Sequence, residues 1–331
     1  MALFRTVSDA DVREMLAAFG VGGYRAHHPI AVGTINTNLR VETDAEQLFL
    51  RINEGKSEDD VWREAAIVAH AAAQGVPTPV PRAASDGLAF ARWRGEFLSL
   101  FPWVAGRTLA RAKLTPAHAA AVGDALAKLH LASAGFPDHS PGRYEPPEIE
   151  ARLARIAALG RPDLAAAVQV LEPELAALRE ERIADIPVGI IHGDLFVDNV
   201  MFDDSGVLAA LIDFEQASWG RVAYDLAVTT LAFGYGRDDF RPEIVRALID
   251  AYGAARAAAA YPVIDAERAA FGAELRFVAC RFAVTRITDV YLKRGAGAAP
   301  GKDFRRYLAR LASVKAHVAA GDGLLALAKG R

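Results

Sequence analysis

The sequence of 331 residues contains a single cysteine, Cys280. One cysteine cannot form an intrachain disulfide, so a disulfide-stapled scaffold is excluded, and so is a metal cluster held by several thiolates. Cys280 lies in an apolar helical pattern, where a free thiol packs as a small hydrophobic residue. This cysteine usage is typical of a reducing compartment, and we expect a cytoplasmic protein.

The sequence also lacks a long apolar run and a strong charge of one sign. No stretch approaches the roughly 18 apolar residues that a transmembrane helix needs, and the N-terminus has no apolar signal core. Lys and Arg together number 38 against 41 Asp and Glu, and the basic residues are spread along the chain. We therefore expect neither a membrane protein nor a nucleic-acid-binding protein.

Strand and helix patterns divide the chain into two parts. Hydrophobic residues make up 52% of the chain, which is long enough for two lobes. The first part has predicted strands near 24–32, 36–43, 47–53, 87–93 and 96–101, and predicted helices at 8–20 and 57–75. The second part has predicted helices at 116–132, 147–158, 163–182, 222–233, 241–257, 264–293 and 303–318, and short strands within 187–213. We predict an α+β protein with a strand-rich lobe at 1–103 and a helical lobe at 104–331.

One short region carries most of the chemical information. Apolar residues flank a polar loop that contains Asp194 and Asn199, and the next apolar strand ends in Asp213. Phosphoryl transfer from a nucleotide needs a carboxylate that orients the attacking hydroxyl, and oxygen ligands that hold Mg2+ against the phosphates. We assign Asp194 to the first role and Asn199 and Asp213 to the second. The pattern therefore predicts a small-molecule kinase.

The same region carries a family resemblance. HGDLFVDN at 192–199 resembles the catalytic loop of the aminoglycoside phosphotransferase superfamily, and LIDFE at 211–215 resembles its metal-binding strand end. The segments that look like the homoserine kinases of this fold are 33–38, 76–79 and 129–136. The resemblance implies a two-lobed, protein-kinase-like fold with an antiparallel-sheet N-lobe and a mainly helical C-lobe. It also implies ATP and Mg2+ as cofactors and L-homoserine, an intermediate of threonine biosynthesis, as the acceptor.

Supporting residues flank the catalytic carboxylate. A histidine at the place of His192 more often braces a loop by hydrogen bonds than transfers protons, and we interpret it as a brace. Asp225 begins a helix and is expected to accept hydrogen bonds from the loop backbone. Gly193 stands where many protein kinases carry an arginine that binds a phosphorylated activation loop, and the segment after Asp213 is too short to dock a peptide. The predicted acceptor is therefore a small molecule.

The segment 33–38 resembles a phosphate loop. The resemblance implies that the backbone at Gly33 and the side chains of Asn36 and Asn38 contact the triphosphate. The segment does not have the G-x-G-x-x-G spacing, so a polar hairpin remains the alternative.

The third predicted strand raises the question of the phosphate clamp. Protein kinases carry a lysine there, whereas this chain offers Arg51, with Lys56 in the next turn as the alternative. Glu64, on the following helix, is the expected partner of whichever cation serves. The adenine ring is expected at the join between the lobes, near the backbone of Leu100, Phe101 and Trp103.

The acceptor residues are the least specified part of the site. Homoserine is a zwitterion and needs a cation for its carboxylate and an acid or carbonyl for its ammonium. The helix predicted over 264–293 offers Arg281 and Arg286, for which ordinary helix ion pairs are the alternative. Glu215 stands two residues after Asp213, where it contacts the metal or the substrate ammonium, or faces solvent.

Two other functions fit the same motif. One is a kinase of another small alcohol, such as an aminoglycoside, choline or a sugar, which a strongly acidic acceptor site would favour. The other is a pseudokinase that binds nucleotide without transferring phosphate, for which Arg51 in place of lysine is the support. The sequence is compatible with a monomer or a homodimer.

Overall fold

The structure, a computed structural model, describes residues 6–30, 36–182, 185–295, 300–321 and 323–327. The chain forms two compact units. The first comprises Met1–Arg107 with Met201–Ser205 and Ala209–Glu215, and the second comprises Thr108–Val200, Gly206–Leu208 and Gln216–Arg331. The lobe boundary expected between 103 and 104 stays a prediction.

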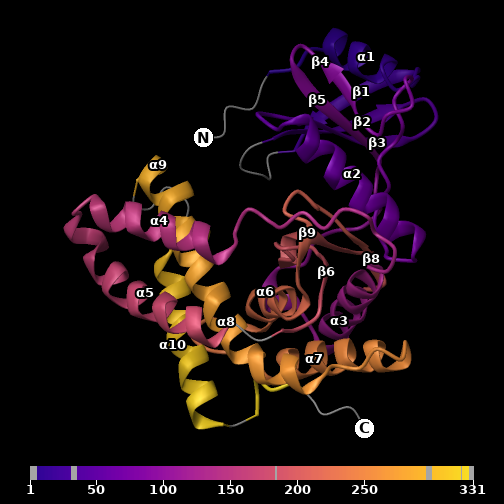
Figure 1. Cartoon of the computed structure of the whole chain (residues 1–331). Helices are drawn as coiled ribbons and strands as arrows, with labels where there is room; N and C mark the ends of the chain where they lie inside the picture. The colour runs from indigo at the N-terminus through magenta and orange to yellow at the C-terminus, as the bar shows by residue number, and fades with distance from the viewer. Residues whose placement is uncertain (1–5, 31–35, 183–184, 296–299, 322, 328–331) are drawn as a thin grey trace. The chain divides into compact units, whose positions relative to one another are not determined.

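The first unit is built on a five-stranded antiparallel sheet (Figure 1). Its strands, in spatial order, are β1 (Tyr24–Pro29), β2 (Thr37–Thr43), β3 (Gln47–Asn53), β5 (Glu96–Pro102) and β4 (Ala91–Trp93). Side chains alternate between the faces of a strand. Leu48, Leu50 and Ile52 of β3 therefore share one face, where they belong to the same buried core as Val12 and Met15 of the helix α1 (Asp9–Ala17).

The opposite face of the same sheet is polar. Arg51 lies opposite Asn38 on β2 and opposite Ser99 on β5, so three polar residues form a row across the strands. Glu64 of the helix α2 (Glu58–Ala73) pairs with Arg51, which places α2 on this face. Because side chains alternate between the two faces of each strand, the apolar core and the polar row lie on opposite faces of the sheet.

The helices of the first unit begin where the sequence predicts. Ser8 and Ser57 are the N-caps of α1 and α2, and each takes part in a capping box with an aspartate three residues later. Three acidic residues occupy the first turn of α2, where negative charge stabilises the positive end of the helix dipole. The tight connection between β4 and β5 is made by Arg94 and Gly95, both with positive φ.

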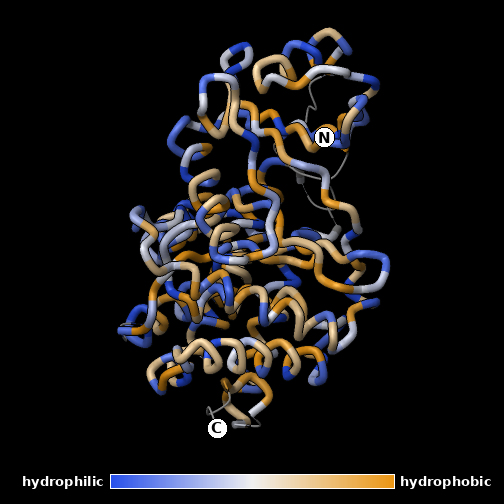
Figure 2. The backbone as a smooth tube through the Cα atoms, turned by 90° about the vertical axis from the view of Figure 1, so that its right-hand side faces the viewer, coloured by the Kyte–Doolittle hydropathy of each residue, from blue (hydrophilic) through white to orange (hydrophobic). Residues whose placement is uncertain are grey.

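The second unit is mainly helical, as predicted. Its long helices are α3 (Pro116–Leu131), α4 (Pro146–Ala158), α5 (Pro162–Glu181), α6 (Val222–Gly234), α7 (Pro242–Ala258), α8 (Asp265–Arg286) and α10 (Arg305–Ala320). Every residue of α6 is buried. Hydrophilic and hydrophobic residues are interspersed along the helical coils of the backbone (Figure 2). At the contact of α3 with α7, a Cβ on Gly123 would lie 2.2 Å from the Leu248 carbonyl oxygen, so only glycine permits this approach.

Short strands position the polar loop of the second unit. β6 (Val188–Ile191) pairs with β9 (Ser218–Arg221), and β7 (Val200–Phe202) pairs with β8 (Leu208–Leu211). The loop at 192–199 connects β6 to β7. The ends of this loop are therefore fixed by two small two-stranded sheets.

One predicted helix differs from the observed one. The segment 264–293 forms α8, then a π-helical turn at Ile287–Tyr291, and then the short helix α9 (Leu292–Arg294). A π-turn inserts an extra residue into the helical register, which periodicity alone does not reveal. None of the helices in the described ranges has the length and apolar character of a bilayer span.

Candidate functional site

The backbone at Gly193 shapes the polar loop. Gly193 has φ +73°, and a Cβ at this position would lie 2.7 Å from the carbonyl oxygen of Gln216. Both the left-handed conformation and the close approach of another backbone segment exclude an L side chain. The glycine that departs from the protein-kinase pattern is therefore required by the local geometry.

Replacing Gly193 with alanine is expected to lower the free energy of unfolding by about 2–4 kcal/mol, since backbone strain and the clash with Gln216 add. Gly75 is the matched control, because it also has positive φ (+85°) but has no atom within 4 Å of the place that an added Cβ would occupy. Gly75→Ala is expected to lower the free energy of unfolding by about 1 kcal/mol, because it adds backbone strain without a clash. Urea unfolding measures both values, and equal losses would contradict the role given to the clash.

Asp225 anchors the same loop. One of its carboxylate oxygens, Oδ2, accepts the backbone N–H of His192 at 2.7 Å, and the other, Oδ1, accepts that of Gly193 at 2.8 Å. His130 Nε2 lies 3.1 Å from Oδ2, and its other ring nitrogen contacts the Tyr252 hydroxyl at 2.9 Å. These are the backbone bonds that the sequence predicts for Asp225, and His130 is a partner that the motif does not reveal.

The environment keeps Asp225 ionised. Burial alone would raise the pKa of this carboxyl, but the hydrogen bond and charge of His130 and the backbone N–H of His192 outweigh it and lower the pKa below its ordinary value. A buried carboxylate that accepts several hydrogen bonds is a rigid anchor, because each bond would be left unsatisfied in any other position. His192 is fully buried beside it, as a loop brace would be.

Asp194 and Asn199 lie on the exposed side of this anchored loop. The Asp194 side chain is 33% exposed, and its Oδ1 lies 3.4 Å from Nη1 of Arg281. Asn199 donates from Nδ2 to the backbone carbonyl of Asp194 at 2.8 Å. Because a carbonyl only accepts, this bond defines the amide orientation and leaves Oδ1 of Asn199 as the atom suited to a hard cation.

Of the two arginines predicted for the acceptor, only Arg281 contacts Asp194 in the described part of the chain. Arg281 is buried, with its guanidinium 4.1 Å from the Tyr144 ring centroid and 3.8 Å from that of Phe282. Burial would lower the pKa of Arg281, but Tyr224 and Asp194 raise it above its ordinary value, so the cation persists. Arg286 is the last residue of α8, 6.0 Å from the Phe282 ring.

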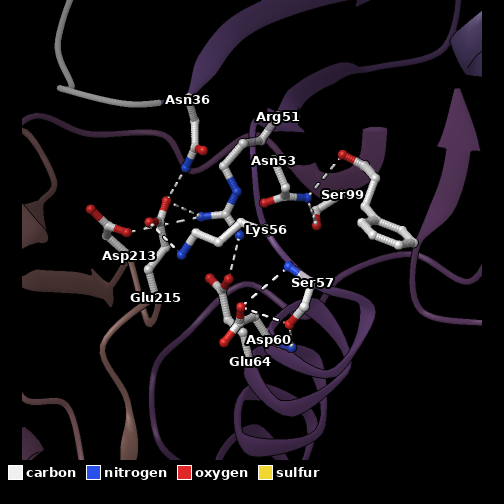
Figure 3. A network of polar contacts seen from close by, with 11 residues as sticks. Asn36, Arg51, Asn53, Lys56, Ser57, Asp60, Glu64, Ser99, Asp213 and Glu215 are labelled. Carbon is white, nitrogen blue, oxygen red and sulfur yellow. Dashed lines mark hydrogen bonds and ion pairs between the residues drawn. The ribbon is translucent and has the colours of Figure 1, made fainter. Parts of the chain in front are cut away.

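Arg51 is the centre of a charged network in the first unit (Figure 3). Its Nη2 donates to Glu64 at 2.7 Å, and its Nη1 donates to Glu215 at 3.3 Å and lies 3.9 Å from Asp213 Oδ1. Burial would lower the pKa of Arg51, but Glu64 and Glu215 raise it well above its ordinary value. Of the two cations left open by the sequence, Arg51 is the one that pairs with Glu64.

Glu215 joins this network from the strand end that carries Asp213. Its Oε2 lies 3.0 Å from Nζ of Lys56, and its Oε1 accepts a hydrogen bond from Asn36. Both oxygens of Glu215 thus contact groups predicted for nucleotide binding. Asp213 itself has φ +64°, a strained conformation for a residue with a side chain, and such residues cluster at functional sites.

The remaining predicted nucleotide residues lie on β2, on β5 or just after it. Asn38 has a buried side-chain oxygen without a hydrogen-bond partner, whereas Gly33 lies outside the described residues. The side chain of Leu100 is in the apolar core. Trp103 donates its backbone N–H to Gln47 at 3.1 Å, so this amide is already used within the sheet. The Phe101 ring lies 5.6 Å from the Arg51 guanidinium.

A hollow in the second unit lies next to the catalytic loop, and the motif did not reveal it. We call it the Arg221 hollow; Gly193, Glu145, Arg182, Arg221 and Tyr224 are among the residues that line it. Gly193 is part of the 192–199 loop and Tyr224 directly precedes Asp225, so the sequence marks the neighbourhood of these two residues. The others come from separate helices and loops and belong to no common pattern.

Comparisons with known proteins agree with this picture. A family model described as "Phosphotransferase enzyme family" matches residues 27–265. Homoserine kinase from Methylobacillus flagellatus is 31% identical and covers 99% of this chain and 98% of that protein. Homoserine kinase from Azorhizobium caulinodans is 33% identical, with coverages of 97% and 98%.

A solved amicoumacin kinase in complex with AMP-PNP, Ca2+ and Ami has a similar fold, with a TM-score of 0.68, 14% identity and coverages of 96% and 95%. The fold class predicted from the sequence is confirmed by this likeness and by the antiparallel sheet and helical unit. The family model spans more than half of the chain, and the two curated relatives span nearly all of it. The chain therefore belongs to the phosphotransferase enzyme family.

Proposed function

We propose that this protein is an ATP-dependent kinase that phosphorylates the hydroxyl of L-homoserine to O-phospho-L-homoserine, a step toward threonine. The observation that carries the proposal is the match, over 97% or more of the chain, to two curated homoserine kinases. The sequence identities are 31% and 33%, and each match extends over nearly the whole length of both proteins. Phosphorylation of homoserine is a small-molecule kinase reaction, which is the class of activity that the loop motif predicts.

The proposed role of Asp194 follows from its geometry. Its carboxylate is partly exposed, whereas the loop that carries it is held by Asp225. We assign to Asp194 the hydrogen bond that orients the acceptor hydroxyl toward the γ-phosphorus, and the uptake of the proton as the new O–P bond forms. The adjacent Arg281 limits the rotation of this carboxylate, because a charge-assisted contact favours one orientation.

The proposed nucleotide and metal groups suit their ligands chemically. Arg51, held by Glu64, is assigned to the ATP phosphates, and its buried Nε has no hydrogen-bond partner. Asn199 and Asp213 are assigned to Mg2+, which keeps several waters and needs few protein ligands. Bound Mg2+ neutralises phosphate charge. The proposal names one amide and one carboxylate as the protein ligands of the ion.

The proposal is tested with a panel of alcohols and a coupled assay of ADP release. We expect kcat/KM for L-homoserine to exceed that for choline, methylthioribose and kanamycin by at least about 100-fold, because a site built for two charged groups rejects molecules that lack them. Phosphorus NMR of the product identifies the phosphate ester. A preference for another alcohol would replace the acceptor, and nucleotide binding without ADP release on any acceptor would identify a pseudokinase.

A further inference from the structure

The Arg221 hollow contains charges of both signs in defined positions. One wall is the segment that leads into α4, and it carries Tyr144 and Glu145. Other parts of the wall are formed by Arg182, which follows α5, and by Arg221 at the end of β9. Gly193 also lines the hollow, and the next residue along the chain is the catalytic carboxylate Asp194. A molecule in this hollow is therefore beside the catalytic loop.

A buried carboxylate holds the two arginines in place. Glu274 of α8 is fully buried, with its Oε2 2.7 Å from Nη2 of Arg182 and its Oε1 2.7 Å from Nε of Arg221. Arg182 also lies 3.8 Å over the ring of Phe277, and Arg221 donates to the Arg182 carbonyl at 3.0 Å. The two guanidinium groups thus share one buried carboxylate. Both arginines line the hollow, whereas Glu274 does not.

Glu145 supplies the opposite charge. It is the residue just before α4, and its side chain makes no capping bond there. Partial withdrawal from water raises the pKa of the Glu145 carboxyl, and Glu274 raises it further, although Arg182 and Arg221 act in the opposite direction. A carboxylate in this position is stabilised by a cation that enters the hollow. The hollow thus offers separate partners for an anion and a cation.

We propose that the Arg221 hollow binds the α-amino-acid end of the acceptor, with the carboxylate at Arg221 and Arg182 and the ammonium at Glu145. The inference rests on the proposed function and adds the residues that select the acceptor. Guanidinium groups bind carboxylates through two parallel hydrogen bonds, and Glu274 orients both arginines before the substrate arrives. A polycation brings no carboxylate for the two arginines, and a neutral alcohol would compensate neither the arginines nor Glu145.

The test combines variants with acceptors that lack one charged group. 4-Hydroxybutyrate lacks the ammonium of homoserine, and 3-aminopropan-1-ol lacks the carboxylate. Glu145→Gln is expected to lower kcat/KM for homoserine by about 10- to 100-fold, mainly through KM, and to leave the value for 4-hydroxybutyrate within about 3-fold. Arg221→Gln is expected to lower kcat/KM for homoserine by a similar factor. It is expected to leave kcat/KM for 3-aminopropan-1-ol, which lacks the carboxylate, nearly unchanged.

Matched controls separate specificity from folding. Glu150→Gln makes the same chemical change on α4, at a residue that pairs with Arg179 outside the hollow. It is expected to leave kcat/KM for all three acceptors unchanged. The KM for ATP should stay constant in every variant. Arg221→Lys keeps the charge without the paired hydrogen bonds and is expected to lie between wild type and Arg221→Gln.

The outcomes distinguish the two proposals. If wild-type protein does not phosphorylate homoserine, the proposed function and the inference both fail. If the wild type is active but Glu145→Gln lowers kcat/KM equally for homoserine and 4-hydroxybutyrate, the proposed function stands and the proposed contact of Glu145 with the ammonium is wrong. If Arg221→Gln lowers kcat/KM equally for homoserine and 3-aminopropan-1-ol, the proposed contact of Arg221 with the substrate carboxylate is wrong.

Discussion

Asp194→Asn is expected to lower kcat by about 100- to 10,000-fold and to leave nucleotide affinity within about 3-fold. The amide has nearly the same shape as the carboxylate, so the loop backbone and the Asn199 bond to the Asp194 carbonyl remain. What is lost is the negative charge to which we assign the uptake of the hydroxyl proton, and which faces Arg281 across 3.4 Å. A group that acts on the reacting atoms affects kcat, whereas the residues proposed to bind ATP in the first unit keep their contacts.

Steady-state kinetics with saturating ATP and calorimetric titration with ADP measure the two quantities. Asp198→Asn is the matched control, because it makes the same change in the same loop at an exposed side chain. It is expected to retain kcat within about 3-fold. Near-normal kcat in Asp194→Asn, or an equal loss in both variants, would contradict the role given to Asp194.

Asp225→Ala is expected to lower the free energy of unfolding by about 3–5 kcal/mol, the range for removing one partner of a buried charged network. The substitution leaves the backbone N–H groups of His192 and Gly193 without their acceptor, and each buried orphan costs about 1–3 kcal/mol. It also removes the partner of His130. The catalytic loop loses its anchor, so kcat is expected to fall together with stability.

Urea unfolding at several pH values provides the measurement. Because the folded protein lowers the pKa of Asp225 below its ordinary value of 3.8, its ionisation stabilises the fold above about pH 4. This contribution disappears as the pH falls through the folded pKa, so the difference between wild type and Asp225→Ala should narrow there. Asp124→Ala, at a half-exposed ion pair with Lys128 on α3, is the control and is expected to cost at most about 1 kcal/mol. A variant as stable as wild type would show that Asp225 is not the anchor.

The sequence alone determined the local elements and indicated the candidate residues of the 192–199 loop. Ser8 and Ser57 begin their helices because a side-chain oxygen satisfies backbone N–H groups within three residues, a relation contained in the local sequence. The alternation along β2 and β3 likewise predicts strands with one buried face. Asp194, Asn199 and Asp213 were identifiable because phosphoryl transfer demands these groups in a short polar loop and at a strand end.

The tertiary structure alone decided which distant side chains meet. Arg51 rather than Lys56 pairs with Glu64, since its position in β3 directs it to the face covered by α2. The Arg221 hollow draws Glu145, Arg182 and Arg221 from three separate segments, so no local pattern announces it. Capping and strand alternation depend on hydrogen bonds and periodicity within a few residues. Pairing across the fold depends on how helices and strands pack, which is set by the whole core.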